Sequence, residues 1–303
     1  MPDANNHRHE HGLHHDLRHM QRLMPRRRAL KWFAGAGTVA MIAGCGEGGS
    51  GESLSTGSTA TPTPTPTPTP GSTATPTPTP TSSAACIADP TETNGPYPAD
   101  GTNTANGLTS NALTATGIVR SDIRSSFIGS STATAAGVRL ALTVTLVDVN
   151  ASCAPLAGYA IYVWHCSGAG KYSLYDLPDE SWLRGVQVTD ANGQASFTTI
   201  VPGCYAGRYP HIHFEIFSSL SSATGGRYAA LISQLAMPAA VCDAVYADTA
   251  SYSGSATNFA RVSIASDNVF GDNSAAQIAQ QTPSVTGSVA AGYAASVVVG
   301  LAR

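Results

Sequence analysis

Alternation of apolar and polar residues is clearest over residues 138–149, where apolar side chains recur at every second position from Val138 to Leu146. A period of two places successive side chains on opposite faces, so this run predicts a strand with one buried face. Shorter runs of similar character predict further strands at 159–164, 185–189, 194–200, 211–217 and 294–301. Short strands separated by Gly, Pro and Asn turns are typical of an all-β domain, and we expect an antiparallel β-sandwich with long loops and few short helices.

Two local signals refine this picture. The dipeptide Asn192-Gly193 lies between two of the predicted strands and is a strong signal for a β-hairpin. Residues 274–281 favour a helix, and a second, short helix is an option within residues 231–245. Both helices are minor elements of a domain that we expect to consist mainly of strands.

The first 45 residues have the order of an export signal. Three arginines, Arg26 to Arg28, precede an apolar run of 13 residues at 32–44, which is shorter than the roughly 20 residues that span a bilayer. This order resembles a bacterial twin-arginine signal, and the segment ending at Cys45 resembles a lipobox whose cysteine is lipidated. An ordinary basic cluster and a stray thiol are the alternatives. We therefore expect export from a bacterial cytoplasm and a lipid anchor at Cys45, on the outer side of the cytoplasmic membrane or in the periplasm or cell envelope.

Composition divides the rest of the chain in two. Residues 46–85 are rich in Gly, Ser and Thr and then in Pro-Thr repeats, which have almost nothing apolar to bury and predict a disordered stalk. Residues 86–303 are long enough for one all-β domain. They carry nine Lys/Arg against fourteen Asp/Glu, a formal charge of −5, so nucleic acid is not an expected partner. Their cysteines, whose pairing the sequence does not assign, are Cys86, Cys153, Cys166, Cys204 and Cys242.

The predicted strand at 211–217 begins with His211-Ile212-His213. Residues i and i+2 of a strand point to the same face, so both imidazoles can reach one metal ion while Ile212 points the other way. Residues 86–303 contain three histidines, and two of them are in this pair. Two surface histidines on a strand are the alternative interpretation.

Two tyrosines, Tyr172 and Tyr205, follow glycine-containing turns at the ends of strand-like runs, where sites often form. Phenols and imidazoles together make a ligand set for a hard, redox-active ion, for which ferric iron is the natural candidate. A tyrosine more often serves core or rim packing, and Tyr175 and Tyr209 lie close by in the sequence. The residues alone therefore leave the choice of tyrosine ligands open.

Four segments resemble motifs of the intradiol ring-cleavage dioxygenases and follow one another in that family's order. They are Thr93 to Tyr97 (Thr-x-Gly-Pro-Tyr), Trp164 to Tyr172 (Trp-x7-Tyr), Thr199 to Tyr205 (Thr-Ile-x-Pro-Gly-x-Tyr) and Arg208 to Phe214 (Arg-x-x-His-Ile-His-Phe). The short loop between Tyr205 and His211 is similar to that of the exported branch of the family. Cys204 stands where the family usually has Pro or Trp, which affects the wall of the expected pocket.

This resemblance implies that a ferric ion is held by Tyr172, Tyr205, His211 and His213. It also implies that Tyr205 is the ligand that moves away when substrate binds, and that Arg208 stabilises negative charge on the substrate. The substrate pocket is implied to include Pro96 and Tyr97. The implied reaction uses O2 to cleave a catechol-type ring between its two hydroxylated carbons, and it gives a cis,cis-muconate-type diacid. Two tyrosinates and a hydroxide would balance the charge of the ion, which a buried site favours.

Two other interpretations stay open. One is a non-catalytic metal- or ligand-binding β-sandwich on a lipid-anchored stalk, which would have no need of four metal-binding side chains. The other is an enzyme that holds zinc, which favours imidazole and thiolate ligands over a pair of phenolates. The four-residue set therefore favours the iron enzyme over both.

Overall fold

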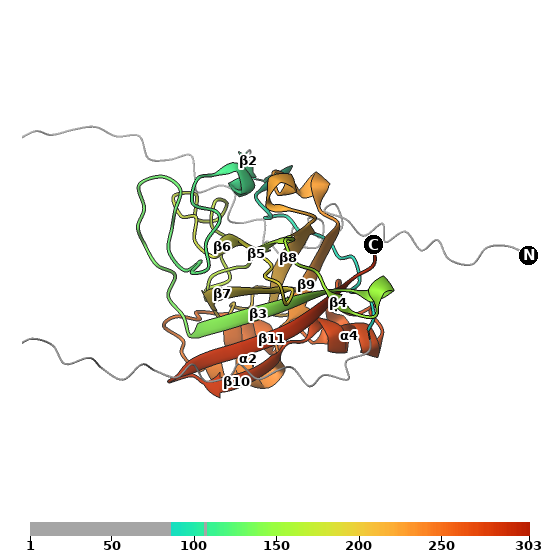
Figure 1. Ribbon diagram of the computed structural model, residues 1–303. Helices are drawn as coiled ribbons and strands as arrows, with labels where there is room; N and C mark the ends of the chain where they lie inside the picture. The colour runs from blue at the N-terminus through green and yellow to red at the C-terminus, as the bar shows by residue number, and fades with distance from the viewer. Residues whose placement is uncertain (1–85, 106–107) are drawn as a thin grey trace, which may run out of the picture. The chain divides into compact units, whose positions relative to one another are not determined.

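The computed structural model describes residues 86–105 and 108–303, which form the domain drawn in colour in Figure 1. The predicted export signal with Cys45 and the predicted stalk at 46–85 lie outside the described residues, so both stay predictions. Within the described part of the chain, no helix has the length and apolar character needed to cross a bilayer. Strands dominate the domain and its helices are short, which confirms the predicted all-β class.

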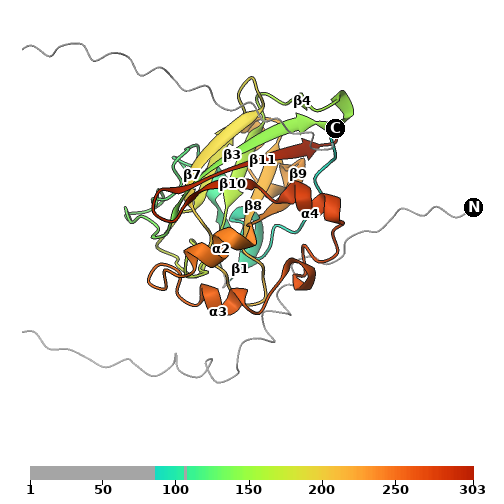
Figure 2. The ribbon, with the colours of Figure 1, turned by 90° about the horizontal axis from the view of Figure 1, so that it is seen from below.

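The first sheet is built around β3 (Arg139–Asp148). Along one edge β3 pairs with β11 (Gly292–Leu301), which in turn pairs with β10 (Ser284–Ser288). Along its other edge β3 pairs with β7 (Gln194–Ile200) and the two-residue β4 (Ala154–Pro155). Figure 2 shows β7, β3 and β11 next to one another in this order.

The pairing of β3 with β11 is parallel, so the first sheet is mixed where the sequence predicted antiparallel pairing. Its register runs from Leu140 opposite Tyr293 to Asp148 opposite Leu301. Parallel neighbours need a long crossover connection. Here the crossover is the chain between β3 and β11, which contains all four strands of the second sheet and also β4, β7 and β10 of the first.

The second sheet is antiparallel throughout. Its order is β6 (Arg184–Val188), β5 (Ala160–Trp164), β8 (His211–Phe217) and β9 (Leu231–Ala236). Every residue of β5 and β8 is buried. Strands that are buried on both faces need cover on the side away from the first sheet, and the loops of the domain provide it.

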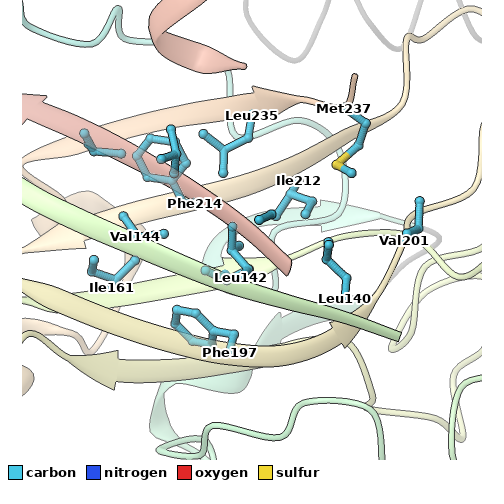
Figure 3. Packing of buried hydrophobic residues seen from close by; sticks show 14 of the residues in the cluster. Leu140, Leu142, Val144, Ile161, Phe197, Val201, Ile212, Phe214, Leu235 and Met237 are labelled. Atoms are coloured by element: carbon cyan, nitrogen blue, oxygen red, sulfur yellow. The ribbon is translucent and has the colours of Figure 1, made fainter. Parts of the chain in front are cut away.

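The hydrophobic core lies between the two sheets (Figure 3). Burial along β3 alternates, so that Leu140, Leu142 and Val144 point inward, as its pattern predicts. The second sheet contributes inward-facing residues from its two central strands, among them Ile161, Val163, Ile212, Phe214 and Ile216. Burying one such side chain stabilises the fold by about 1.5–3 kcal/mol. This packing fixes which face of β8 is left for polar residues.

The predicted hairpin at Asn192-Gly193 is wrong in one respect. The turn exists, because Gly193 N donates to Asp190 O at 2.9 Å and Gly193 has a φ of +73°. However, β6 pairs with β5 and β7 pairs with β3, so the turn passes from one sheet to the other. Turn residues specify a chain reversal, whereas the sheet that each strand joins depends on partners far away in the sequence.

The α-helices of the described residues are α2 (Ala239–Val245), α3 (Ser255–Phe259) and α4 (Ala275–Gln281). α4 confirms the helix predicted at 274–281, and the hydroxyl of Ser274 accepts from Gln277 N to cap it. α2 is the short helix expected within 231–245, whereas β9 occupies the start of that range. The antiparallel pair β1 (Asp100–Ala105) and β2 (Leu108–Asn111) was not predicted, nor were β4, β9, β10 and α3.

A disulfide joins Cys86 to Cys153, which the sequence left unassigned, and the thiols of Cys166, Cys204 and Cys242 are free and buried. From Cys86 the chain runs beside strands of both sheets. Asp89 N donates to Gly300 O at 2.9 Å, and Glu92 N donates to Ile232 O at 2.8 Å. This path carries residues 93–97 to the polar face of β8.

Candidate metal centre

β8 presents both histidines of the His-x-His pair on one face. His211 and His213 point away from the core, whereas Ile212 between them belongs to it. The Nε2 atoms of the two imidazoles lie 3.0 Å apart, and both rings are buried. The strand geometry expected from the sequence is therefore present, and the alternative of two surface histidines does not hold.

Both tyrosines approach the histidines from loops. The hydroxyl of Tyr172 lies 3.5 Å from Nε2 of His211 and 3.3 Å from Nε2 of His213. The hydroxyl of Tyr205 lies 3.3 Å from Nε2 of His211. The alternative tyrosines lie elsewhere. The hydroxyl of Tyr175 accepts from Ala99 N and donates to Asn103, and the ring of Tyr209 packs against those of Phe259 and Phe270. The structure thus brings together the four side chains that the resemblance selects.

The four donor atoms are spaced as ligands of one ion would be. Donors about 2.0–2.1 Å from a common ion lie roughly 2.9–3.5 Å from one another, which matches the separations of 3.0–3.5 Å found here. Nδ1 of His211 donates to Tyr209 O at 2.5 Å, so in the neutral imidazole Nε2 carries the lone pair. Two imidazole lone pairs and two phenol oxygens that converge in this way fit a hard trivalent ion.

Burial keeps the ion-free side chains neutral. It raises the pKa of Tyr172 well above the usual value of 10, with a further contribution from Tyr205, and it raises the pKa of Tyr205 as well. Burial lowers the pKa of His211 to about 3 and that of His213 well below 6.5. A bound cation inverts this preference for phenols, because a nearby positive charge favours the phenolate.

The surroundings of the donor set come from distant parts of the chain. The indole of Trp164 lies parallel to the His213 imidazole, with ring centroids 4.7 Å apart and an angle of 5° between the planes. Gly95 lies on the same imidazole, where a Cβ would come within 3.2 Å of Cε1. The ring of Tyr97 is 5.0 Å from that of Tyr172, and Pro96 is buried next to it in the chain. Residues 95–97 therefore lie beside two of the four donors, His213 and Tyr172.

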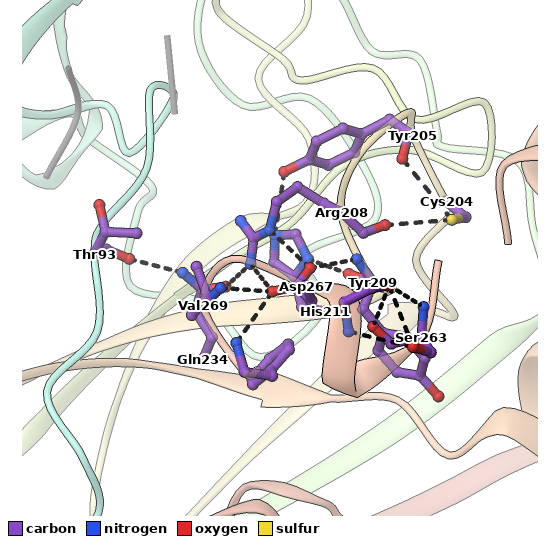
Figure 4. Close-up of polar contacts among 12 residues, drawn as sticks. Thr93, Cys204, Tyr205, Arg208, Tyr209, His211, Gln234, Ser263, Asp267 and Val269 are labelled. Atoms are coloured by element: carbon purple, nitrogen blue, oxygen red, sulfur yellow. Dashed lines mark hydrogen bonds and ion pairs between the residues drawn. The ribbon is translucent and has the colours of Figure 1, made fainter. Parts of the chain in front are cut away.

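Arg208 is held in a polar network next to the donor set (Figure 4). Its Nε donates to Oδ2 of Asp267 at 3.0 Å, and its Nη2 donates to Oε1 of Gln234 at 2.7 Å. Gln234 in turn donates to Thr93 O at 2.8 Å. Burial has the largest effect on the pKa values of Tyr205 and His211. The positive charge of Arg208 has the next largest effect, and it lowers both pKa values. This places a buried positive charge where it acts on the donor atoms.

Asp267 and Gln234 were missed in the sequence. Gln234 lies opposite His213 in the register of β8 and β9, but β9 itself was not predicted. Asp267 lies in a loop far from the four motifs, and no local signal marks it. His165, the third histidine of the domain, hydrogen-bonds Thr199 Oγ1 at 2.6 Å and Cys166 O at 2.8 Å. These contacts give His165 a structural role outside the donor set.

Known proteins resemble this chain over its central part. A family model described as a dioxygenase matches residues 118–239. The beta chain of a protocatechuate 3,4-dioxygenase from Burkholderia cepacia is 34% identical over 94 residues, which cover 27% of this chain and 39% of that protein. A chlorocatechol 1,2-dioxygenase from Rhodococcus opacus is 31% identical over 120 residues, which cover 33% of this chain and 43% of that protein. The chain thus spans less than half the length of the curated relatives it matches.

The fold has a solved counterpart. An intradiol ring-cleavage dioxygenase from Tetranychus urticae superposes with a TM-score of 0.52 and 23% sequence identity, covering 72% of this chain and 95% of that one. At this identity the likeness establishes the fold. The family match at 118–239 includes every proposed metal ligand and Arg208, whereas Pro96, Tyr97 and Asp267 lie outside it.

Proposed function

Because the chain belongs to the intradiol ring-cleavage dioxygenase family, we propose that it is a ferric-iron enzyme that acts on a catechol-type compound and O2. The ring is cleaved between its two hydroxylated carbons, and the product is a cis,cis-muconate-type diacid. The observation that carries this proposal is the convergence of two phenol oxygens and two imidazole nitrogens. Nε2 of His211 lies 3.0–3.5 Å from the other three donor atoms, and the hydroxyl of Tyr172 lies 3.3 Å from Nε2 of His213.

The proposed ligands of the ion are Tyr172, Tyr205, His211 and His213. When bound, a ferric ion supplies the charge that ionises coordinated phenols and the capacity to draw electron density from a catechol, which activates the ring towards O2. Neutral imidazoles and ionised phenols suit a hard trivalent ion better than zinc, whose sites favour nitrogen and sulfur ligands. The site therefore supports an iron enzyme over a zinc enzyme.

The two tyrosines are proposed to act differently. The side chain of Tyr172 is only 2% exposed and packs between the rings of Tyr97 and Tyr205. Tyr205 is partly exposed and precedes the turn at Ala206 and Gly207, at the edge of the site. We assign Tyr205 as the ligand that gives way to substrate and accepts a proton from it, and Tyr172 as the ligand that stays.

Arg208 is proposed to stabilise negative charge that develops on the substrate. Its guanidinium is buried, and a charge held rigidly in a buried site acts more strongly than the same charge in water. Pro96 and Tyr97 are proposed to line the pocket, because they lie beside Tyr172 and follow Gly95, which contacts His213. A planar aromatic substrate suits this aromatic surrounding.

The experiment is to purify the full chain, load it with Fe(III), and record its iron content, visible spectrum and O2 consumption with catechol. We expect a charge-transfer band that colours the protein, a shift of this band on addition of catechol, and turnover. Tyr205→Phe and His213→Ala should each lose iron or turnover. Tyr209→Phe is the matched control, since its phenol is outside the donor set while its backbone carbonyl is unchanged.

Three results would each lead to a different conclusion. A colourless protein that stays free of iron contradicts the metal centre. A protein that binds zinc in preference to iron favours the zinc alternative. Iron loading and catechol binding without O2 consumption would favour a metal- or ligand-binding module on a stalk over an enzyme.

A further inference from the structure

The segment that follows α2, residues 246–270, lies beyond the matched region 118–239 and packs against the loop that carries Tyr205 and Arg208. Four side chains of this segment hydrogen-bond the loop backbone: Tyr252 to Val201 O at 3.1 Å, Tyr246 to Pro202 O at 2.9 Å, Asn258 to Cys204 O at 2.8 Å, and Ser255, which accepts from Cys204 N at 2.9 Å. The position of the loop is thus set by residues that come after the matched region.

Asp267 of this segment makes an ion pair with Arg208 of the loop, with 3.0 Å between Nε and Oδ2. Asp267 is 2% exposed, and its carboxylate accepts from N–H groups of Arg208, Tyr209, Val269 and Phe270. Oδ2 accepts from Arg208 Nε at 3.0 Å and Tyr209 N at 2.6 Å, and Oδ1 accepts from Val269 N at 2.8 Å and Phe270 N at 3.1 Å. A carboxylate with several N–H donors and a guanidinium partner is stabilised in its charged form despite burial. Asp267 is therefore a fixed negative charge.

This arrangement fixes the plane of the guanidinium. Nε of Arg208 is directed at Asp267 and Nη2 at Gln234, and Nη2 is also 3.4 Å from Oδ1 of Asp267. Because the guanidinium is planar, two partners at different nitrogens set both its position and its orientation. The negative charge of Asp267 also offsets a buried positive charge beside the metal site, which would otherwise be costly.

We propose that Asp267 is a positioning residue of the ring-cleavage reaction, which holds Arg208 in the orientation that stabilises charge on the substrate. The inference rests on the proposed function and deepens it, because it assigns a role to the segment beyond the matched region. Asp267 acts through Arg208 and contacts neither metal nor substrate. Removing it should therefore lower kcat while the iron centre stays intact.

The test compares Asp267→Asn with Asp248→Asn in the full, iron-loaded chain. Asp248 is the matched control, because its Oδ1 accepts from Ala250 N and Ser251 N, two and three residues ahead, as Oδ1 of Asp267 does with Val269 N and Phe270 N. Asp267→Asn should lower kcat with catechol on the order of 10²-fold, the loss typical of a misplaced catalytic group. KM, iron content and the charge-transfer band should change little, and Asp248→Asn should match the wild type.

A double-mutant cycle separates positioning from a general structural role. If Asp267 acts through Arg208, Asp267→Asn should change the residual kcat of Arg208→Ala less than about twofold. Losses that multiply instead would overturn the inference, and so would wild-type kcat in Asp267→Asn. Asp267→Ser provides a second variant if Asp267→Asn does not fold, because its hydroxyl can still accept from the turn N–H groups while the oxygen that faces Arg208 is gone.

Two measurements distinguish this inference from the proposed function. An iron-loaded wild-type chain that does not consume O2 with catechol contradicts the function itself. An active wild type with an unaffected Asp267→Asn contradicts only the role of Asp267. The affinity for catechol can be measured without O2 from the shift of the charge-transfer band. It should be nearly equal in wild type and Asp267→Asn, because Arg208 is proposed to act on charge that develops after the substrate has bound.

Discussion

Gly170 lies directly against Tyr205, so closely that a Cβ on Gly170 would come within 2.9 Å of the Cβ of Tyr205. Gly170 also has a φ of +70°, which a residue with a side chain rarely adopts. Gly170 is two residues before Tyr172, so this contact joins the two loops that bring the proposed tyrosine ligands together. The distance between the two phenols depends on the absence of a side chain at position 170.

Replacing Gly170 with Ala should therefore disturb the metal centre as well as the stability of the fold. The matched control is Gly158→Ala, because Gly158 has a φ of +81° but no atom within 4 Å of the place that a Cβ would occupy. Both variants should lose about 1 kcal/mol of unfolding free energy from the unfavourable φ. Only Gly170→Ala should lose iron and at least tenfold in kcat, and equal behaviour of the two variants would contradict this interpretation of the contact.

The disulfide between Cys86 and Cys153 should stabilise the domain. It closes a loop with a sequence separation of 67 residues, for which restriction of the unfolded chain contributes about 4 kcal/mol. The double variant Cys86→Ala/Cys153→Ala should lose about 2–4 kcal/mol of unfolding free energy in urea denaturation. A reductant should destabilise the wild type by a similar amount and leave the double variant unchanged. An unfolding free energy that is insensitive to reductant would refute the prediction.

Asp89 should make the domain less stable as the pH rises. Burial raises the pKa of its carboxyl from 3.8 to about 7, although Gly300 N donates to Oδ2 at 2.7 Å and opposes the rise. Between these two pH values the folded chain binds more protons than the unfolded chain, so the contribution of Asp89 to the unfolding free energy falls from about pH 4 to about pH 7.

The variant Asp89→Asn removes the titration and keeps an oxygen acceptor. It should be more stable than the wild type at pH 8 and close to it at pH 4.5, as measured by urea denaturation at both pH values. Asp190→Asn serves as control, because Asp190 is exposed and its Oδ1 accepts from Asn192 N and Gln194 N in a surface turn. A difference between Asp89→Asn and wild type that is the same at both pH values would count against this account.

The lipid anchor predicted at Cys45 lies outside the described residues and has its own test. Expression of the full chain in a bacterium with metabolic labelling by a fatty acid should place the label on the protein and the protein in the membrane fraction. Cys45→Ala should lose the label and leave the membrane fraction, while the iron centre and its band are unchanged. An unlabelled wild-type chain in the soluble fraction would speak against the lipobox.

The local part of the site could be predicted from the sequence. The position of His211 and His213 on one face of a strand depends only on the period of two, which holds for any strand. The inward face of β3 followed from its alternation for the same reason, and burial along that strand confirms it. The tyrosines required the motifs of a known family, because a phenol on a loop has no periodicity that marks it as a ligand.

The remaining features depend on contacts between residues far apart in the chain. The parallel pairing of β3 with β11, the passage of the Asn192-Gly193 turn between two sheets, and the disulfide of Cys86 with Cys153 all connect segments whose order in the sequence does not fix their neighbours in space. Asp267 belongs to the same group, since it meets Arg208 across 59 residues.

By itself, then, the sequence determined the strand faces, the histidine pair, the candidate chemistry and the expected export and stalk segments. Only the tertiary structure decided how loops from four parts of the chain meet at the polar face of β8, and which residues hold Arg208. Periodicity and turn chemistry act over a few residues, whereas the placement of Gly95, Tyr172, Tyr205 and Asp267 results from the packing of two sheets and the loops that cover them.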